Sequence, residues 1–128
     1  MNVTVLLIED NEQNRYLLSF LLEKSGHRVS AVADGPRGIE AARASPPKLI
    51  LLDIQLPKMD GYAVARALRE NPALRDTPIV AVTSYAMSGD MEKAFEAGCT
   101  GYIEKPINPD TFVSEIEQIL ARSNGGRP

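Results

Sequence analysis

The chain has 128 residues, enough for one compact domain. Its 14 Lys and Arg against 17 Asp and Glu give a formal net charge of −3, which argues against a nucleic-acid-binding surface because such surfaces need clustered positive charge. The single cysteine, Cys99, excludes an internal disulfide and suits the reducing cytoplasm. The longest apolar runs, residues 3–8 and 49–52, are too short to span a membrane, and no basic side chain precedes the first run, so we expect no secretory signal.

The predicted elements alternate five times between strand and helix. Residues 3–8 are apolar apart from Thr4, which is typical of a strand buried on both faces. A helix is predicted from Asn11 to a cap at Gly26. Leucines recur along it at helical spacing: Leu17, Leu18, Leu21 and Leu22.

The second strand, around residues 29–33, alternates apolar and polar residues, which favours a place near a sheet edge. Residues 34–36 (Asp-Gly-Pro) begin the second helix, and the two prolines at 46–47 end it. The third strand, residues 49–52, is fully apolar and ends at Asp53.

The third helix is predicted to begin at Asp60-Gly61 and to end near Asn71-Pro72. The fourth strand, residues 79–82, is apolar and ends at Thr83. The fourth helix is predicted to present one face made of Met87, Met91, Ala94, Phe95 and Gly98.

The fifth strand, residues 101–103, is short and ends near Lys105. Asn108 is predicted to cap the last helix, with Pro109 at its first position. We expect one domain over residues 1–122 and a flexible polar tail over residues 123–128. The alternation as a whole predicts an α/β fold with a parallel sheet and helices on both faces.

Charged and polar residues collect at the ends of these strands. The first strand ends in Glu9-Asp10 and the third in Asp53, while Thr83 and Lys105 follow the fourth and fifth. Because the carboxyl ends of parallel strands share one edge of a sheet, we expect these residues to converge. Three carboxylates repel one another unless a cation intervenes, and oxygen ligands favour Mg²⁺ or Ca²⁺ over Zn²⁺. Mg²⁺ typically uses one or two carboxylates, which leaves one as a nucleophile toward a phosphoryl group.

Each of these residues also has an ordinary structural interpretation. Glu9-Asp10 could stabilise a helix N-terminus by about 0.3–1 kcal/mol. Asp53 and Thr83 could be turn residues, and Lys105 a solvated surface charge. Their joint position at successive strand ends is what favours a chemical site.

The chain resembles the response regulator receiver domains of two-component signalling over residues 2–121. The matching stretches are residues 5–11, 51–61, 81–83 and 105–106. The resemblance implies a doubly wound, five-stranded parallel sheet in the order 2-1-3-4-5. Residues 9–14, 53–57 and 86–90 are most similar to receivers of the single-domain DivK type and to receivers inside hybrid kinases.

The resemblance implies that Asp53 is the phosphoacceptor. Glu9 and Asp10 match the acidic pair that holds Mg²⁺, and the backbone carbonyl of Gln55 matches a further metal ligand. Glu9 stands where an Asp is more usual, so its longer side chain could bind the ion directly or through water.

The resemblance also implies a switch. Thr83 matches the hydroxyl that hydrogen-bonds the phosphoryl group, Lys105 the lysine that neutralises it, and Tyr102 the aromatic side chain that turns inward. A cis peptide bond is implied before Pro106.

The implied partners are proteins. A sensor histidine kinase or a histidine phosphotransfer protein would donate the phosphoryl group, and an effector would bind the face formed by the fourth helix, fifth strand and fifth helix. We expect no enzyme activity on an external metabolite, no nucleic-acid partner and no membrane association. Met1 and the short tail favour a stand-alone domain over a piece of a longer protein.

Three other functions remain to be weighed. A phosphatase with an Asp nucleophile would place a second Asp where Gln55 stands and would need a cap that 128 residues hardly allow. A nucleotide-binding flavodoxin-like domain would need a phosphate-binding loop where Glu9, Asp10 and Glu12 stand. A receiver-like module that binds partners without phosphorylation would not need the complete set of site residues.

Overall fold

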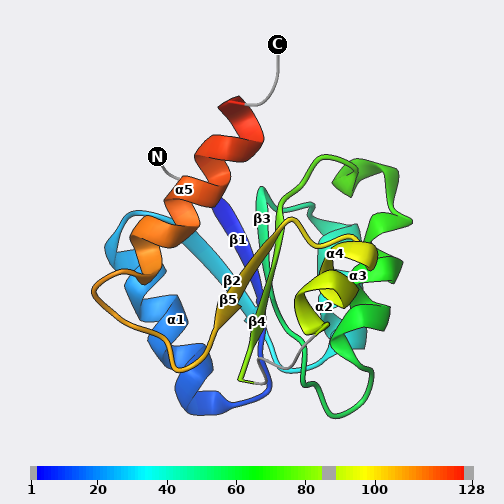
Figure 1. The fold of residues 1–128 in the computed structure, drawn as a ribbon, viewed down its shortest axis with the longest axis horizontal. Helices are drawn as coiled ribbons and strands as arrows, with labels where there is room; N and C mark the ends of the chain where they lie inside the picture. The colour runs from blue at the N-terminus through cyan, green and yellow to red at the C-terminus, as the bar shows by residue number, and fades with distance from the viewer. Residues whose placement is uncertain (1–2, 85–88, 126–128) are drawn as a thin grey trace.

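The computed structural model describes residues 3–84 and 89–125, and it contains one five-stranded parallel sheet in the order β2-β1-β3-β4-β5 (Figure 1). The strands are β1 (Thr4–Ile8), β2 (Arg28–Val32), β3 (Leu49–Asp53), β4 (Ile79–Thr83) and β5 (Gly101–Glu104). The helices are α1 (Glu12–Lys24), α2 (Gly35–Ala44), α3 (Gly61–Arg69), α4 (Asp90–Glu96) and α5 (Phe112–Gly125), with a short 3₁₀ helix, η1 (Pro72–Leu74). The predicted fold class and strand order are confirmed.

Helices cover both faces of the sheet. Helices α1 and α5 lie on one face, where Leu18 and Phe112 pack in a common core with Leu7 and Leu51. Helices α2, α3 and α4 lie on the other (Figure 1). Strands β3 and β4 are buried along their whole length, whereas β2 is partly exposed at the edge of the sheet, as its alternating pattern predicts.

Polar side chains begin the helices that follow the first three strands. Asn11 caps α1 by accepting from Asn14 N at 2.9 Å, and Asp34 caps α2 by accepting from Arg37 N at 2.9 Å. Asp60 caps α3 by accepting from Tyr62 N at 2.7 Å. These caps satisfy amide groups that the first helical turn leaves unpaired. Because each of these helices follows a parallel strand, their N-termini lie at the edge where the strands end.

Helix α4 differs from its predicted packing. Met91 and Phe95 are each 46% exposed, whereas Ala94 is fully buried and Ala97, just beyond the helix, is nearly so. The helix therefore packs through small side chains and turns its large apolar ones outward. Met87, assigned to the same face, lies outside the described residues.

The last helix begins later than predicted. Regular helix starts at Phe112, because Asn108 holds residues 109–111 in a turn: its Oδ1 accepts from Asp110 N at 2.9 Å and its carbonyl from Phe112 N at 3.0 Å. Helix α5 continues to Gly125, so the last turn of the helix includes the first residues of the polar segment that we expect to be flexible. Serine and asparagine are only moderately unfavourable in a helix, so a polar composition does not by itself end one.

Candidate functional site

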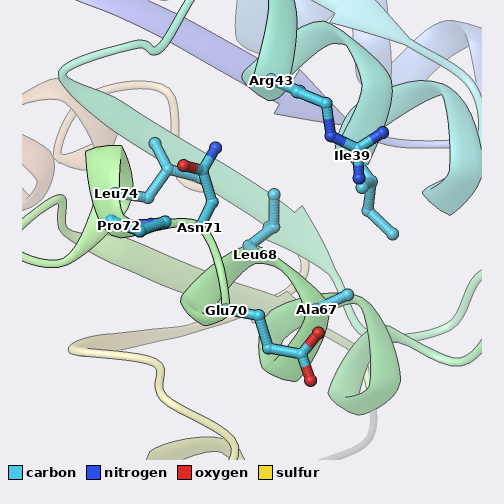
Figure 2. A pocket seen from close by; sticks show the side chains of 8 residues that line it. All are labelled: Ile39, Arg43, Ala67, Leu68, Glu70, Asn71, Pro72 and Leu74. Atoms are coloured by element: carbon cyan, nitrogen blue, oxygen red, sulfur yellow. The ribbon is translucent and has the colours of Figure 1, made fainter.

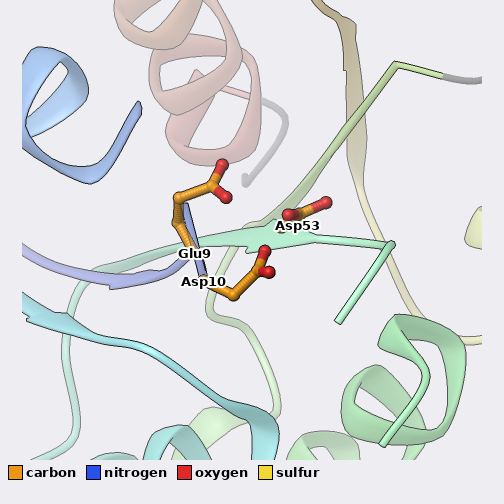
Figure 3. Close-up of side chains that lie close together, drawn as sticks. All are labelled: Glu9, Asp10 and Asp53. Atoms are coloured by element: carbon orange, nitrogen blue, oxygen red, sulfur yellow. The ribbon is translucent and has the colours of Figure 1, made fainter. Parts of the chain in front are cut away.

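The carboxyl ends of the strands bring the predicted polar residues together. Glu9 and Asp10 follow β1, Asp53 ends β3, Thr83 ends β4 and Lys105 follows β5. Figure 3 shows the side chains of Glu9, Asp10 and Asp53 close together at this edge, and one carboxylate oxygen of each lies within 4.8 Å of the others. Carboxylates at this separation repel one another, so the cluster needs positive charge nearby.

Lys105 supplies part of that charge. Its Nζ lies 2.9 Å from Glu9 Oε1 and 3.5 Å from Asp53 Oδ2. The side chains of Lys105, Glu9 and Asp53 are 13%, 1% and 3% exposed, so water and salt screen this three-residue ion pair only weakly. Asp10, by contrast, is exposed.

Asp53 is held in an unusual electrostatic environment. Burial, and to a lesser extent the neighbouring Glu9, raise the pKa of its carboxyl, and the Gln55 amide and the charge of Lys105 oppose them, so that the net pKa is about 7. Gln55 N donates to Asp53 Oδ1 at 2.9 Å, which orients the carboxylate. For Lys105, burial lowers the pKa, but the close carboxylate of Glu9 and the charge of Asp53 outweigh it, so the net pKa is raised and the ammonium keeps its charge.

The raised pKa of Asp53 predicts that metal-free protein loses stability as the pH rises. Its ordinary value is 3.8 and its folded value about 7, so the folded state binds more protons than the unfolded state in that window. The stabilisation that protonated Asp53 provides is therefore complete below pH 3.8, and it is lost as the pH rises through about 7. In metal-free buffer, the urea concentration at the unfolding midpoint should fall between about pH 5 and about pH 8. It should fall less steeply with pH in Asp53→Asn than in the wild type. Equal slopes in the two proteins would contradict this assignment.

Both carboxylate oxygens of Glu9 have protein partners. Oε1 is buried and forms an ion pair with Lys105 without an aligned hydrogen bond, whereas Oε2 accepts a hydrogen bond from Asn11 N at 3.0 Å. Glu9 N donates in turn to Val32 O at 3.1 Å, which extends the pairing of β1 with β2 past the end of the strand. Glu9 is thus fixed in place, while its neighbour Asp10 faces solvent.

Ser84 contributes a contact that the sequence reasoning missed. Its Oγ donates to Gln55 Oε1 at 2.7 Å, so the end of β4 is joined to the loop after β3. These residues line an open hollow of about 680 Å³ formed by Glu9, Asp10, Asn11, Asn14, Leu17, Asp53, Gln55, Ser84, Lys105, Pro106 and Ile107.

The predicted switch residues lie on neighbouring strands. Thr83 is buried at the end of β4, and Tyr102 of β5 pairs with Ala81, two residues before Thr83. Side chains two residues apart on a strand share a face, so Thr83 and Tyr102 lie on the same side of the sheet. The peptide bond between Lys105 and Pro106 is cis, the arrangement that the resemblance implies.

A second hollow, of about 340 Å³, lies near the ends of α2 and α3 and at η1 (Figure 2). It is lined by Ile39, Arg43, Ala67, Leu68, Glu70, Asn71, Pro72 and Leu74. Its lining mixes apolar side chains with one arginine, one glutamate and one asparagine. The other hollow gathers three carboxylates and a lysine, and it is therefore the stronger candidate for chemistry.

Comparison with known proteins decides the family. The family model described as "Response regulator receiver domain" matches residues 5–117. The chain belongs to the response regulator receiver family. This receiver is 40% identical to the polar-differentiation response regulator DivK of Brucella ovis over 120 residues, which cover 94% of this chain and 98% of DivK. The sequence-based identification is therefore confirmed.

Solved structures of other receivers are similar to this receiver over nearly its whole length. The chemotaxis protein CheY4 of Vibrio cholerae has a TM-score of 0.88 at 26% identity, over 93% of this receiver and 99% of that chain. The receiver domain of the sensor histidine kinase PA1611 of Pseudomonas aeruginosa PAO1 has a TM-score of 0.84 at 35% identity, over 98% of this receiver and 99% of that chain. The PA1611 receiver domain was solved with a magnesium ion coordinated in its active site cleft.

Membership in the family defines the general role of the receiver. Receiver domains are signalling modules that interact with histidine kinases and effectors, and they typically bind Mg²⁺ at an acidic pocket. Among the helices of the described residues, none is long and apolar enough to cross a membrane.

Proposed function

We propose that this receiver accepts a phosphoryl group on Asp53 from the phosphohistidine of a sensor histidine kinase or a phosphotransfer protein in the cytoplasm. An effector protein then reads the phosphorylated state. The observation that carries the proposal is the cluster at the open edge of the sheet, where carboxylate oxygens of Asp53, Glu9 and Asp10 lie within 4.8 Å of one another and Lys105 contacts two of the three residues.

The donor set fits Mg²⁺, because it consists of oxygen atoms that carry more negative charge than one lysine neutralises. Asp10, Asp53 and the backbone carbonyl of Gln55 would hold the ion, with Glu9 completing the acidic pair. The partners on both oxygens of Glu9 and the exposure of Asp10 favour Asp10 as the direct ligand of the pair. The bound ion would supply positive charge against the carboxylates and the phosphoryl oxygens.

The protein groups around Asp53 suit it to in-line attack. One carboxylate oxygen forms the new P–O bond while the N–P bond of the phosphohistidine breaks, and the departing imidazole takes up a proton. Gln55 N orients the carboxylate from Oδ1, and Lys105 Nζ lies 3.5 Å from Oδ2, where its charge favours the ionised nucleophile. Lys105 and the Thr83 hydroxyl then contact the new phosphoryl oxygens.

The output surface is the face formed by α4, β5 and α5. Movement of Thr83 toward the phosphoryl group leaves space on its side of the sheet, and Tyr102 turns into that space. Two large apolar side chains of α4, Met91 and Phe95, are already 46% exposed, which supports a protein partner at this face.

Phosphotransfer profiling tests this function. The receiver is mixed with each phosphorylated histidine kinase and phosphotransfer protein of the source organism, and we expect rapid, Mg²⁺-dependent transfer from one or a few of them. The affinity for an isolated effector should then change when beryllofluoride occupies the site. The same affinity with and without beryllofluoride would instead favour a module that phosphorylation does not regulate.

A further inference from the structure

Arg15 connects helix α1 to the acidic pair. From the first turns of α1 its side chain reaches back to the end of β1, where Nη1 lies 3.0 Å from the carbonyl oxygen of Glu9 and 3.3 Å from that of Asp10. One guanidinium nitrogen therefore lies between the main-chain oxygens of both acidic residues. Arg15 itself is partly buried.

These two carbonyl groups lie at a junction in the backbone. Strand β1 ends at Ile8 and Asn11 is the N-cap of α1, so the peptide groups of Glu9 and Asp10 fall between the regular hydrogen bonding of the two elements. Backbone oxygens that are not hydrogen-bonded in a partly buried junction cost free energy and leave the chain direction poorly fixed. A cationic donor makes stronger hydrogen bonds to them than a neutral one.

The two members of the acidic pair depend on this backbone to different degrees. Glu9 is also held through its carboxylate by Lys105 and by the Asn11 amide. The side chain of Asp10 is exposed, so the position of its carboxylate follows the position of its main chain. A contact to the Asp10 carbonyl therefore affects where the more accessible carboxylate points.

We infer that Arg15 is a positioning residue for the metal site of this receiver: it fixes the backbone from which Glu9 and Asp10 project. The inference deepens the proposed function and rests on it, because it assumes that the acidic pair holds Mg²⁺. Both contacts are made by Nη1, whose two hydrogens can serve the two carbonyls at the full length of the arginine side chain.

Mg²⁺ titration by calorimetry tests the inference without any phosphodonor. Arg15→Gln is expected to raise the dissociation constant for Mg²⁺ about tenfold, as is usual when a group that orients metal ligands is lost. In labelling by a small phosphodonor, the half-saturating Mg²⁺ concentration should rise by the same factor, while the rate at saturating Mg²⁺ is unchanged. A purely structural role would lower the unfolding midpoint and leave the Mg²⁺ affinity of the folded protein unaltered.

Two further variants sharpen the test. Arg43→Gln removes the same charge from an exposed arginine of α2 and should bind Mg²⁺ as the wild type does. Arg15→Lys keeps the charge and the donors but has a shorter side chain that reaches the two carbonyls less well, so it should recover part of the affinity. It also keeps the test open should Arg15→Gln fail to fold.

The outcomes separate this inference from the proposed function. An Arg15→Gln protein that folds and binds Mg²⁺ like the wild type would overturn the inference, as would equal losses in Arg15→Gln and Arg43→Gln or no recovery in Arg15→Lys. A wild type that binds Mg²⁺ but is never phosphorylated would overturn the proposed function alone. A wild type that binds no Mg²⁺ would overturn both.

Discussion

Asp53→Asn is expected to abolish labelling of the receiver by acetyl phosphate and Mg²⁺. The amide has no anionic oxygen to attack phosphorus, and the neighbouring carboxylates are differently engaged: Glu9 through both oxygens, and Asp10 as the proposed ligand of the ion. Intact-mass measurement of the labelled protein gives the result directly. The fold should survive, because a neutral amide replaces a carboxyl whose charged form is disfavoured by burial and by the neighbouring Glu9.

Asp76→Asn is the matched control for this experiment. Asp76 is an exposed aspartate in the segment before β4, at the opposite end of that strand from Thr83, so its variant should be labelled like the wild type. Undiminished labelling of Asp53→Asn would show that another residue receives the phosphoryl group, and the assignment of the nucleophile would be lost.

Lys105→Met is expected to be strongly destabilising in metal-free buffer at alkaline pH. Lys105 is the ion-pair partner of both Glu9 and Asp53, whose side chains are 1% and 3% exposed, and its loss leaves two buried carboxylates facing each other. Breaking a buried ion pair from one side typically costs about 3–5 kcal/mol. Urea unfolding should therefore give a much lower midpoint than for the wild type.

Two further experiments distinguish charge repulsion from lost side-chain packing as the cause of the lower stability of Lys105→Met. If repulsion between the carboxylates dominates, Mg²⁺ should restore much of the stability of Lys105→Met, and so should adding Asp53→Asn in the same chain. Lys58→Met is a control, because Lys58 lies 3.4 Å from Asp34 Oδ2 but is 65% exposed, and exposed ion pairs contribute little. A Lys105→Met protein as stable as Lys58→Met would contradict the electrostatic account.

Much of the fold follows from local pattern. Apolar runs at 49–52 and 79–82 predict strands, and β3 and β4 are buried along their whole length. The strand order was less accessible, because periodicity does not encode which strands pair; it came from resemblance. The exposure of Met91 and Phe95 could not be predicted either, since an apolar stripe has the same spacing in the sequence whether it packs on the sheet or binds a partner.

The part of the site formed by charged residues at the ends of strands could be predicted from the sequence. Glu9, Asp53 and Lys105 could be placed together because parallel strands end at one edge of the sheet. The contacts of Arg15 and Ser84 could not, because a side chain that bonds a backbone carbonyl or an amide side chain leaves no spacing pattern in one sequence. That Lys105 lies nearer Glu9 than Asp53 depends on side-chain length and packing, which also lie beyond a sequence motif.

The most direct test of the central claim is to map the phosphorylated residue. The receiver is phosphorylated with Mg²⁺, reduced with borohydride so that an aspartyl phosphate becomes homoserine, and digested for peptide mass spectrometry. We predict homoserine at position 53, dependent on Mg²⁺ and absent when EDTA is added before the phosphodonor. Modification at Asp10 or elsewhere, or none in protein shown to be folded, would contradict the account.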